Sequence, residues 1–425
     1  MKRKRRAGSP RAALAGALLF ILLGTGLYAV SPAILPVRIL EGPLVQQARE
    51  DGATLVWYTT RPLEPGEAVL ILEDGPVEHR FPVEPSARRN VVQITGLAAA
   101  GQYPYRIGLG RRTLAQATLH TAKPPGEPLS FIVFGDSGRG TIEQYRLAAQ
   151  MRAPGMQPDF LLHTGDLVYG SGERSDFKDR FFAPYRAVIA EVCFWPALGN
   201  HDIATDDGQP YLDVFELPEN GPPALPPERN YWFDYASARV VVIDSNPDES
   251  TLATHVAPWV REVFSGCDAT WKFVSLHHPP YTGGAYRPDV GIQRALVPAF
   301  EETGVDVVFC GHDHMYQRTY SLRGGQIVPD GAGVVYVVTG AGGGRLYDPL
   351  PPERQPPYIA AIYSARHSFT HVELSGLTLR LQQIDINGRV VDEWSFTKDT
   401  LPATQPATQE PDAGPDPPAP PERSP

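Results

Sequence analysis

Five short polar segments constrain the fold of this chain more than any other feature of its sequence. Each segment follows a run of apolar, β-favouring residues, and a glycine precedes the key residue in four of the five. In open α/β sheets, ligand-binding side chains lie at the carboxyl ends of strands, and glycine permits the tight turn found there. We therefore expect the segments to meet at one edge of a sheet. They are Gly135–Gly138, Gly165–Tyr169, Gly199–Asp202, Val274–His277 and Gly311–His314.

The stretch from residue 129 to 398 alternates apolar runs with amphipathic stretches, and this alternation predicts an α/β domain. The expected buried strands are Phe131–Phe134, Phe160–Leu162, Val240–Ile243, Phe273–Leu276 and Val307–Cys310. The expected helices are Thr141–Arg152, Asp176–Val192, Leu252–Phe264 and Ile292–Glu302. Strand signals dominate again after Val334, as in Leu377–Ile384, and predict a second sheet packed on the first.

Residues 36–122 read as an all-β domain, because short β-favouring runs alternate there with Gly, Pro and Asp. The runs are Ala53–Thr59, Ala68–Leu72, Val91–Thr95, Tyr103–Ile107 and Gln116–His120. The stiff segment Lys123–Pro128 marks the boundary with the α/β domain.

The polar segments contain the residue types of a metal site. Aspartate, histidine, asparagine and tyrosine supply oxygen and imidazole nitrogen ligands, and no thiolate is needed. Seven such groups are too many for one zinc ion, which usually takes about four protein ligands. They suit two metals that share one carboxylate. His312 and His314 are two residues apart, so in an extended chain they point the same way and can serve neighbouring metals.

The five segments resemble the pattern of the purple acid phosphatases, within the calcineurin-like metallophosphoesterase superfamily. That pattern is D-x-G, G-D-x-x-Y, G-N-H-[DE], V-x-x-H and G-H-x-H in this order, and every element is present. The resemblance covers about residues 129–398 and implies a two-sheet αββα sandwich. The preceding β-domain resembles a fibronectin type III domain, in which a tyrosine closes a corner.

The resemblance also implies roles for individual residues. Asp136, Tyr169 and His314 would bind the first metal, expected to be Fe(III). A second, divalent metal (Fe, Zn or Mn) would be bound by Asn200, His277 and His312. Asp166 would bridge the two ions. Tyr169 points to the purple acid phosphatases in particular, because most other relatives lack this tyrosine and have a histidine where this chain has Gly138.

We expect hydrolysis of phosphate monoesters by hydroxide activated at the metals, with His201 protonating the leaving group. Asp202 is expected to hold His201, and Asn200 and His278 are expected to contact the substrate. Two alternatives stay open: a phosphodiesterase or nucleotide hydrolase with the same centre, and a surface-binding protein with an inactive catalytic domain. Gly340–Gly344 lacks the form of a phosphate loop and is interpreted as a turn that passes close to the site.

Charge and termini limit the partners and the location. A net charge of -10 argues against nucleic acid binding, so the expected partners are small phosphate esters. Basic residues followed by an apolar stretch over 12–30 predict export, through either a signal peptide ending near residue 31 or an uncleaved membrane anchor. Residues 399–425 are rich in Pro, Ala, Asp and Glu and are expected to be a disordered tail.

The three cysteines form no metal-binding or disulfide pattern. Cys193 and Cys310 lie in apolar runs and are expected to be buried thiols, with a Cys193–Cys267 bridge as the alternative. His163 is expected to face the core or the surroundings of the site.

Overall fold

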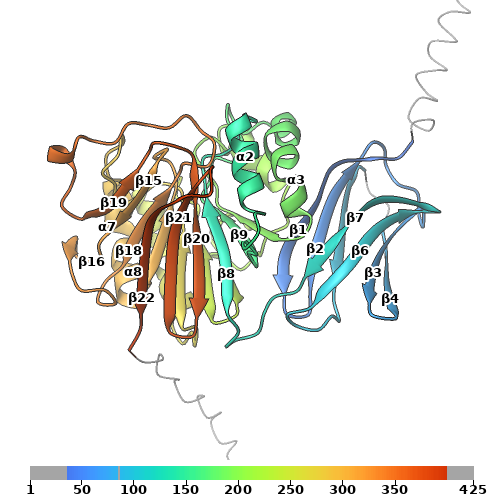
Figure 1. Cartoon of the computed structure of the whole chain (residues 1–425), viewed down its shortest axis with the longest axis horizontal. Helices are drawn as coiled ribbons and strands as arrows, with labels where there is room; N and C mark the ends of the chain where they lie inside the picture. Colours follow the sequence, from blue (N-terminus) through green and yellow to red (C-terminus); the bar gives the residue numbers. More distant parts are fainter. Residues whose placement is uncertain (1–35, 85–86, 400–425) are drawn as a thin grey trace, which may run out of the picture.

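The computed structural model describes residues 36–84 and 87–399, and its N-terminal part is a β-sandwich (Figure 1). One sheet has the strand order β1-β2-β5 and the other β4-β3-β6-β7. The strands are β1 (Ile39–Arg49), β2 (Gly52–Thr59), β3 (Ala68–Asp74), β4 (Val77–Pro82), β5 (Arg89–Ile94), β6 (Gln102–Leu109) and β7 (Arg112–His120). The five strands expected from the sequence are therefore present.

Two strands of the sandwich were not expected. β1 contains Gly42 and Pro43, which weaken a strand signal, and its register with β2 shifts around them. β4 is a mostly exposed edge strand with little apolar content. Tyr103 closes a corner, since its hydroxyl accepts a hydrogen bond from the Ala98 amide (2.8 Å) and lies 3.2 Å from the Ala98 carbonyl oxygen.

Two larger sheets face each other in the second part of the chain. The six-stranded sheet has the order β10-β9-β8-β20-β21-β22, and the seven-stranded sheet has the order β11-β12-β13-β14-β18-β15-β19. Strands of the first are β8 (Leu129–Phe134), β9 (Phe160–His163), β10 (Cys193–Pro196), β20 (Ser368–Ser375), β21 (Thr378–Asp385) and β22 (Val390–Thr397). Strands of the second are β11 (Tyr231–Tyr235), β12 (Ala238–Val242), β13 (Trp271–Ser275), β14 (Val307–Cys310), β15 (Tyr316–Thr319), β18 (Val335–Thr339) and β19 (Ile359–Tyr363). A small hairpin joins β16 (Leu322–Arg323) to β17 (Gln326–Ile327).

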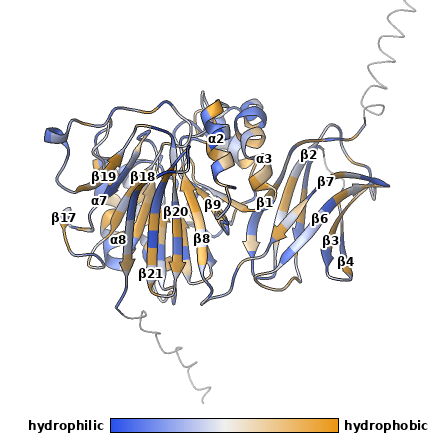
Figure 2. Cartoon of the chain, viewed as in Figure 1, coloured by the Kyte–Doolittle hydropathy of each residue, from blue (hydrophilic) through white to orange (hydrophobic). Residues whose placement is uncertain are grey.

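Successive side chains of the inner strands serve two cores. Phe273 and Phe309 pack between the sheets, where their rings lie 5.4 and 6.1 Å from the ring of Phe131 on β8. Their neighbours Val274 and Val308 point to the other face and pack under the helices there. This alternation follows from the twofold repeat of a strand. Figure 2 shows β8 as hydrophobic along nearly its whole length, as expected for a strand with both faces covered.

The helices cover the outer faces and deviate locally from the expected spans. They are α2 (Ile142–Gln150), α3 (Ala183–Ile189), α4 (Gln209–Leu212), α5 (Glu249–Thr251), α6 (Ala257–Phe264), α7 (Val290–Ala295) and α8 (Val297–Thr303). Single π-helical turns precede α3 and α6, at Lys178–Phe182 and Leu252–Val256. The helix expected over Ile292–Glu302 is divided at Leu296, because Pro298 has no amide hydrogen for the preceding turn. The αββα arrangement predicted for this part is confirmed.

The sequence suggested that the late strands form a second sheet of their own, but they are divided between the two sheets. β20, β21 and β22 extend the sheet that begins with β8, whereas β15, β18 and β19 extend the sheet that contains β13 and β14. β1 of the sandwich lies beside β10, where Gln46 Nε2 donates to the Phe194 carbonyl (3.4 Å) and the Ala48 amide lies 3.4 Å from Cys193 Sγ. The two parts of the protein thus share a packed boundary.

All three cysteines are free, and Cys193 and Cys310 are buried, as expected. The alternative bridge between Cys193 and Cys267 is not formed. No helix within residues 36–84 and 87–399 has the length and apolar character needed to cross a membrane. The apolar stretch 12–30 and the tail from residue 400 onward lie outside the described residues.

Candidate metal centre

The five polar segments meet at one end of the two sheets. β8, β9 and β10 run parallel, as do β12, β13 and β14, so their carboxyl ends point the same way. Asp136 follows β8, Asp166 follows β9, Asn200 follows β10, and His277 follows β13. The G-H-x-H segment follows β14. All ten residues predicted for the site lie in this region.

Left-handed backbone conformations aim three of these side chains. Asp136, Asp166 and His312 have φ values of 56°, 57° and 68°. Such conformations are unfavourable for residues other than glycine and persist only where the surroundings impose them. Their occurrence at three predicted ligands indicates a site that has been shaped for function.

The glycines before these residues mostly permit close packing rather than a special turn. Only Gly165 has a positive φ, at +97°. A Cβ atom on Gly199 would lie 2.2 Å from Asp166 Oδ1, and one on Gly311 would lie 2.5 Å from Asp136 Oδ2. These distances are far shorter than a van der Waals contact. The absence of a side chain at Gly199 and Gly311 therefore allows the carboxylates of Asp166 and Asp136 to lie against the backbone there.

Asp136, Tyr169 and His314 form the first half of the centre, and all three are nearly fully buried. The Tyr169 hydroxyl lies 2.7 Å from His314 Nε2 and 3.2 Å from Asp136 Oδ1, and His314 Nε2 lies 3.4 Å from the same carboxylate oxygen. His314 Nδ1 is 2.7 Å from the carbonyl oxygen of Arg345. Because a carbonyl can only accept, Nδ1 carries a proton, and Nε2 is the nitrogen that faces the centre.

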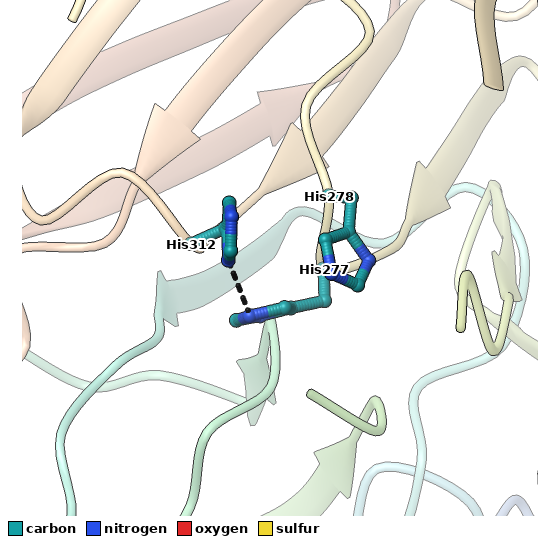
Figure 3. Close-up of side chains that lie close together, drawn as sticks. All are labelled: His277, His278 and His312. Carbon is teal, nitrogen blue, oxygen red and sulfur yellow. Dashed lines mark hydrogen bonds between the residues drawn. The ribbon is translucent and has the colours of Figure 1, made fainter. Parts of the chain in front are cut away.

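Asn200, His277 and His312 form the second half. Asn200 Oδ1 lies 3.0 Å from both His277 Nε2 and His312 Nδ1, and these nitrogens are 3.3 Å apart. Figure 3 shows the two imidazoles turned toward each other, with His278 beside them. His277 Nδ1 lies 2.8 Å from the Thr164 carbonyl oxygen and so carries the proton, which leaves the Nε2 lone pair directed at Asn200.

Asp166 lies between the two halves. Its Oδ1 is 3.6 Å from His277 Nε2 in the second half. Ligand atoms of Asp136, Asp166 and His314 lie within 4.8 Å of one another, which places Asp166 beside the first half as well. The position suits a carboxylate shared by two ions.

The spacing of these atoms fits bound metal ions. Two ligand atoms that each lie about 2.1 Å from one cation are about 3.0–3.4 Å apart at ordinary bond angles. The distances within the halves, from 2.7 to 3.4 Å, agree with this. The lone pairs of these oxygen and nitrogen atoms also point toward one another, and there are too few hydrogen atoms to pair all of them in hydrogen bonds. A bound cation would relieve this repulsion. The residues present therefore fit two metal ions.

Burial shifts the pKa values of several residues in the centre. It lowers the pKa of His277 to about 4 and that of His312 to about 3, so both imidazoles are neutral near neutral pH. Burial raises the pKa of Asp166. It also raises the pKa of Tyr169 well above its usual value, and the charge of Asp136 adds to this effect. Burial acts to lower the pKa of His314, but its hydrogen bond to Asp136 and that carboxylate's charge outweigh it and raise the pKa.

His201 lies at the open side of the centre, with its side chain 40% exposed. Its Nδ1 is 2.9 Å from the Gly170 carbonyl oxygen, and its Nε2 is 4.0 Å from Asp166 Oδ2. The expectation that Asp202 holds His201 is wrong. The buried Asp202 carboxylate accepts hydrogen bonds from the amides of Asp166, Leu167 and Gly199, at 2.8, 2.9 and 2.9 Å. Asp202 thus fixes the backbone of the central aspartate, and the Gly170 carbonyl orients His201.

His278 lies beside the second half of the centre. Its Nδ1 is 2.9 Å from Ser245 Oγ, and its ring lies 4.7 Å from that of His312. His163 is buried and lies 2.9 Å from Ser137 Oγ, so it supports the segment that carries Asp136, as expected.

The glycine-rich segment 340–344 passes close to the centre, as expected. A Cβ atom on Gly340 would lie 2.7 Å from Asp136 Oδ2, and one on Gly344 would lie 2.8 Å from His314 Nδ1. The sequence did not point to Tyr347, which follows this segment and stacks on His314 with 4.2 Å between ring centres. Nothing local marks a lone tyrosine in a loop as part of a site.

Comparisons with known proteins relate this chain to phosphoesterases. The family model described as calcineurin-like phosphoesterase matches residues 129–316. Purple acid phosphatase 17 of Arabidopsis thaliana is 24% identical over 313 residues, which cover 67% of this chain and 89% of that protein. The Fe(3+)-Zn(2+) purple acid phosphatase 12 of the same plant is 27% identical over 292 residues, covering 61% and 60% of the two chains.

A solved structure shares the fold. The purple acid phosphatase from yellow lupin (Lupinus luteus) seeds superposes with a TM-score of 0.70, at 17% identity, over 84% of this chain and 74% of that one. The chain therefore carries a calcineurin-like phosphoesterase domain, has the purple acid phosphatases among its homologues, and is a phosphatase-type hydrolase.

Proposed function

We propose that this protein hydrolyses phosphate monoesters at a dinuclear metal centre. Asp136, Tyr169 and His314 would hold Fe(III), Asn200, His277 and His312 would hold a divalent Fe, Zn or Mn ion, and Asp166 would bridge them. The observation that carries the proposal is the convergence of these seven side chains at ligand–ligand distances. The carboxylate and phenol oxygens of the first half suit a hard trivalent ion. The similarity to the Fe(3+)-Zn(2+) purple acid phosphatase 12 of Arabidopsis thaliana supports such a pair of metals.

When bound, two such ions would neutralise the phosphoryl group and lower the pKa of a water molecule at the centre. The chain's own residues then act on the two ends of the ester. Asn200, through its amide, and His278, which lies beside His312, would contact the phosphate. His201 would protonate the leaving oxygen; its side chain is 40% exposed and its Nε2 lies 4.0 Å from Asp166 Oδ2, which supports this role.

Two further proposals concern the domains of the chain and its export. We propose a β-domain over residues 36–122 and a catalytic domain over 129–398. The corner formed by Tyr103 and Ala98 supports a fibronectin type III-like domain. The basic and apolar segment before residue 31 supports export, either free or anchored.

The test is hydrolysis by the purified, metal-loaded protein. We expect it to hydrolyse p-nitrophenyl phosphate at least about 10-fold faster than bis(p-nitrophenyl) phosphate, with loss of activity after chelation and recovery with metal. The reverse preference would replace the proposal with a phosphodiesterase. Bound metal without hydrolysis of either ester would leave a binding protein instead.

A further inference from the structure

Two tyrosines extend the candidate centre on one side. Tyr286 stacks on His312, with 4.3 Å between ring centres and 29° between ring planes. Tyr347 stacks on His314 at 4.2 Å and 8°. The two tyrosine rings also meet edge to face at 5.7 Å. Four rings from three segments, those of Tyr286, His312, His314 and Tyr347, thus form one continuous aromatic surface, which we call the aromatic wall.

Both tyrosines are held in place by the segments that carry the histidines. Asp313, between the two histidines, accepts hydrogen bonds from Thr282 Oγ1 (2.5 Å) and the Ala285 amide (3.1 Å), which fix the loop before Tyr286. The Tyr347 amide donates to the His314 carbonyl at 3.2 Å. A platform fixed in this way loses little conformational entropy when a ligand binds.

The wall is open to solvent. Tyr286 is 44% exposed although it is a large aromatic residue, and Tyr347 is partly exposed. The partly exposed His201 lies near the first half, where its ring is 4.9 Å from that of Tyr169. Arg139 also lies against Tyr169, with its guanidinium 4.8 Å from the ring centre. The rim of the centre is therefore aromatic beside His312 and His314 and cationic beside Tyr169.

We infer that the aromatic wall binds the leaving group of the substrate, and that the preferred substrates are phosphate monoesters whose leaving group carries a planar aromatic ring, such as a nucleobase. This inference rests on the proposed function. A ring stacked on an exposed tyrosine gains binding that an open-chain or bare sugar ester cannot gain, because every base presents a flat face. Tyr286 and Tyr347 are then specificity residues, whereas the reaction itself belongs to the centre.

The experiment compares adenosine 5′-monophosphate with ribose 5-phosphate. Both esters release the same kind of primary alkoxide, so the base is the main difference between them. We expect kcat/KM to favour the nucleotide by about 10-fold, from the usual strength of base–tyrosine stacking. Tyr286→Leu should reduce this ratio by about fivefold or more, whereas Tyr286→Phe should keep it. Damage to metal binding would lower both rates and leave the ratio unchanged.

Tyr320→Leu is the matched control, because Tyr320 is 48% exposed but makes no ring contact with the centre among the described residues. A second measurement uses the methylene phosphonate analogue of adenosine monophosphate, whose binding is followed by calorimetry and needs no turnover. Equal affinity in the wild type and Tyr286→Leu, or an unchanged substrate ratio, would overturn the inference. If neither ester is hydrolysed, the proposed function fails, and the phosphonate binding still decides whether the wall holds a planar ring.

Discussion

The two halves of the centre contain the same number of side chains but differ in charge and access. Asp136, Tyr169 and His314 are buried and include two oxygens that can become anionic. Asn200 and His312 are partly exposed, and together with His277 they offer only uncharged metal ligands. A buried anionic set stabilises a highly charged ion, whereas a neutral and more open set suits a divalent ion that meets substrate. The asymmetry predicts that each half has its own task, and the following experiments test that division.

The largest effect is expected for the residue that belongs to both halves. Asp166→Asn removes the one carboxylate placed between them, so both ions should be held more loosely and activity should fall by roughly 10³-fold. Metal analysis together with p-nitrophenyl phosphate turnover measures this. Asp348→Asn, an exposed carboxylate on the loop that follows the glycine-rich segment, should change neither quantity. Normal turnover in Asp166→Asn would rule out a bridging role.

Removing one ligand from one half should deplete the metal of that half and leave much of the other metal bound. Asp136→Asn should deplete iron while much of the second metal remains, and His277→Ala should do the opposite, each with metal affinity lowered at least about 100-fold at its own half. Elemental analysis after dialysis against a weak chelator measures both metals. Equal loss of both ions in each variant would show that the halves do not bind independently.

A smaller and more selective effect is expected for His201, which belongs to neither half. His201→Ala should slow hydrolysis of alkyl phosphates by about 10²-fold, because a poor leaving group needs a proton, and should slow p-nitrophenyl phosphate much less. Metal content should stay unchanged, which separates this variant from the ligand variants. An equal loss for both esters would contradict the role as acid.

The smallest effect on rate is expected for Tyr169→Phe, which keeps the ring and removes only the hydroxyl of the first half. Visible absorption from a phenolate–Fe(III) pair should disappear, while turnover should fall by about 10-fold or less. A spectrum recorded beside iron analysis distinguishes loss of colour from loss of metal. A colourless wild-type protein that contains only zinc would contradict the assignment of iron to this half.

Much of this arrangement follows from short stretches of sequence. The apolar runs before Asp136, Asp166 and His277 identify the strands, and the ends of parallel strands necessarily share an edge. The residue types of the seven metal-site side chains already indicate two metals. Local patterns carry this information because strand periodicity and turn chemistry involve only neighbouring residues.

Other features depend on contacts between distant segments. The carboxylate of Asp202 could be assigned to the backbone of Asp166 only once the two loops were placed together, 36 residues apart in the chain. The glycine-rich segment leaves room for the His314 ring, since a Cβ atom on Gly344 would lie 2.8 Å from it, and Tyr347 stacks on that ring from the loop that follows. The missed strand β4 has too little apolar content to be recognised without its partner β3.

The sequence by itself determined the inventory of the protein: an α/β domain, a β-domain before it, and seven side chains, predicted to bind metal, in a fixed order. The tertiary structure decided which imidazole nitrogen faces the centre, which backbone amides the Asp202 carboxylate holds, and which aromatic rings surround the centre. The physical reason is that residue type and spacing are local properties. Hydrogen bonds and stacking between remote loops exist only after the chain has folded.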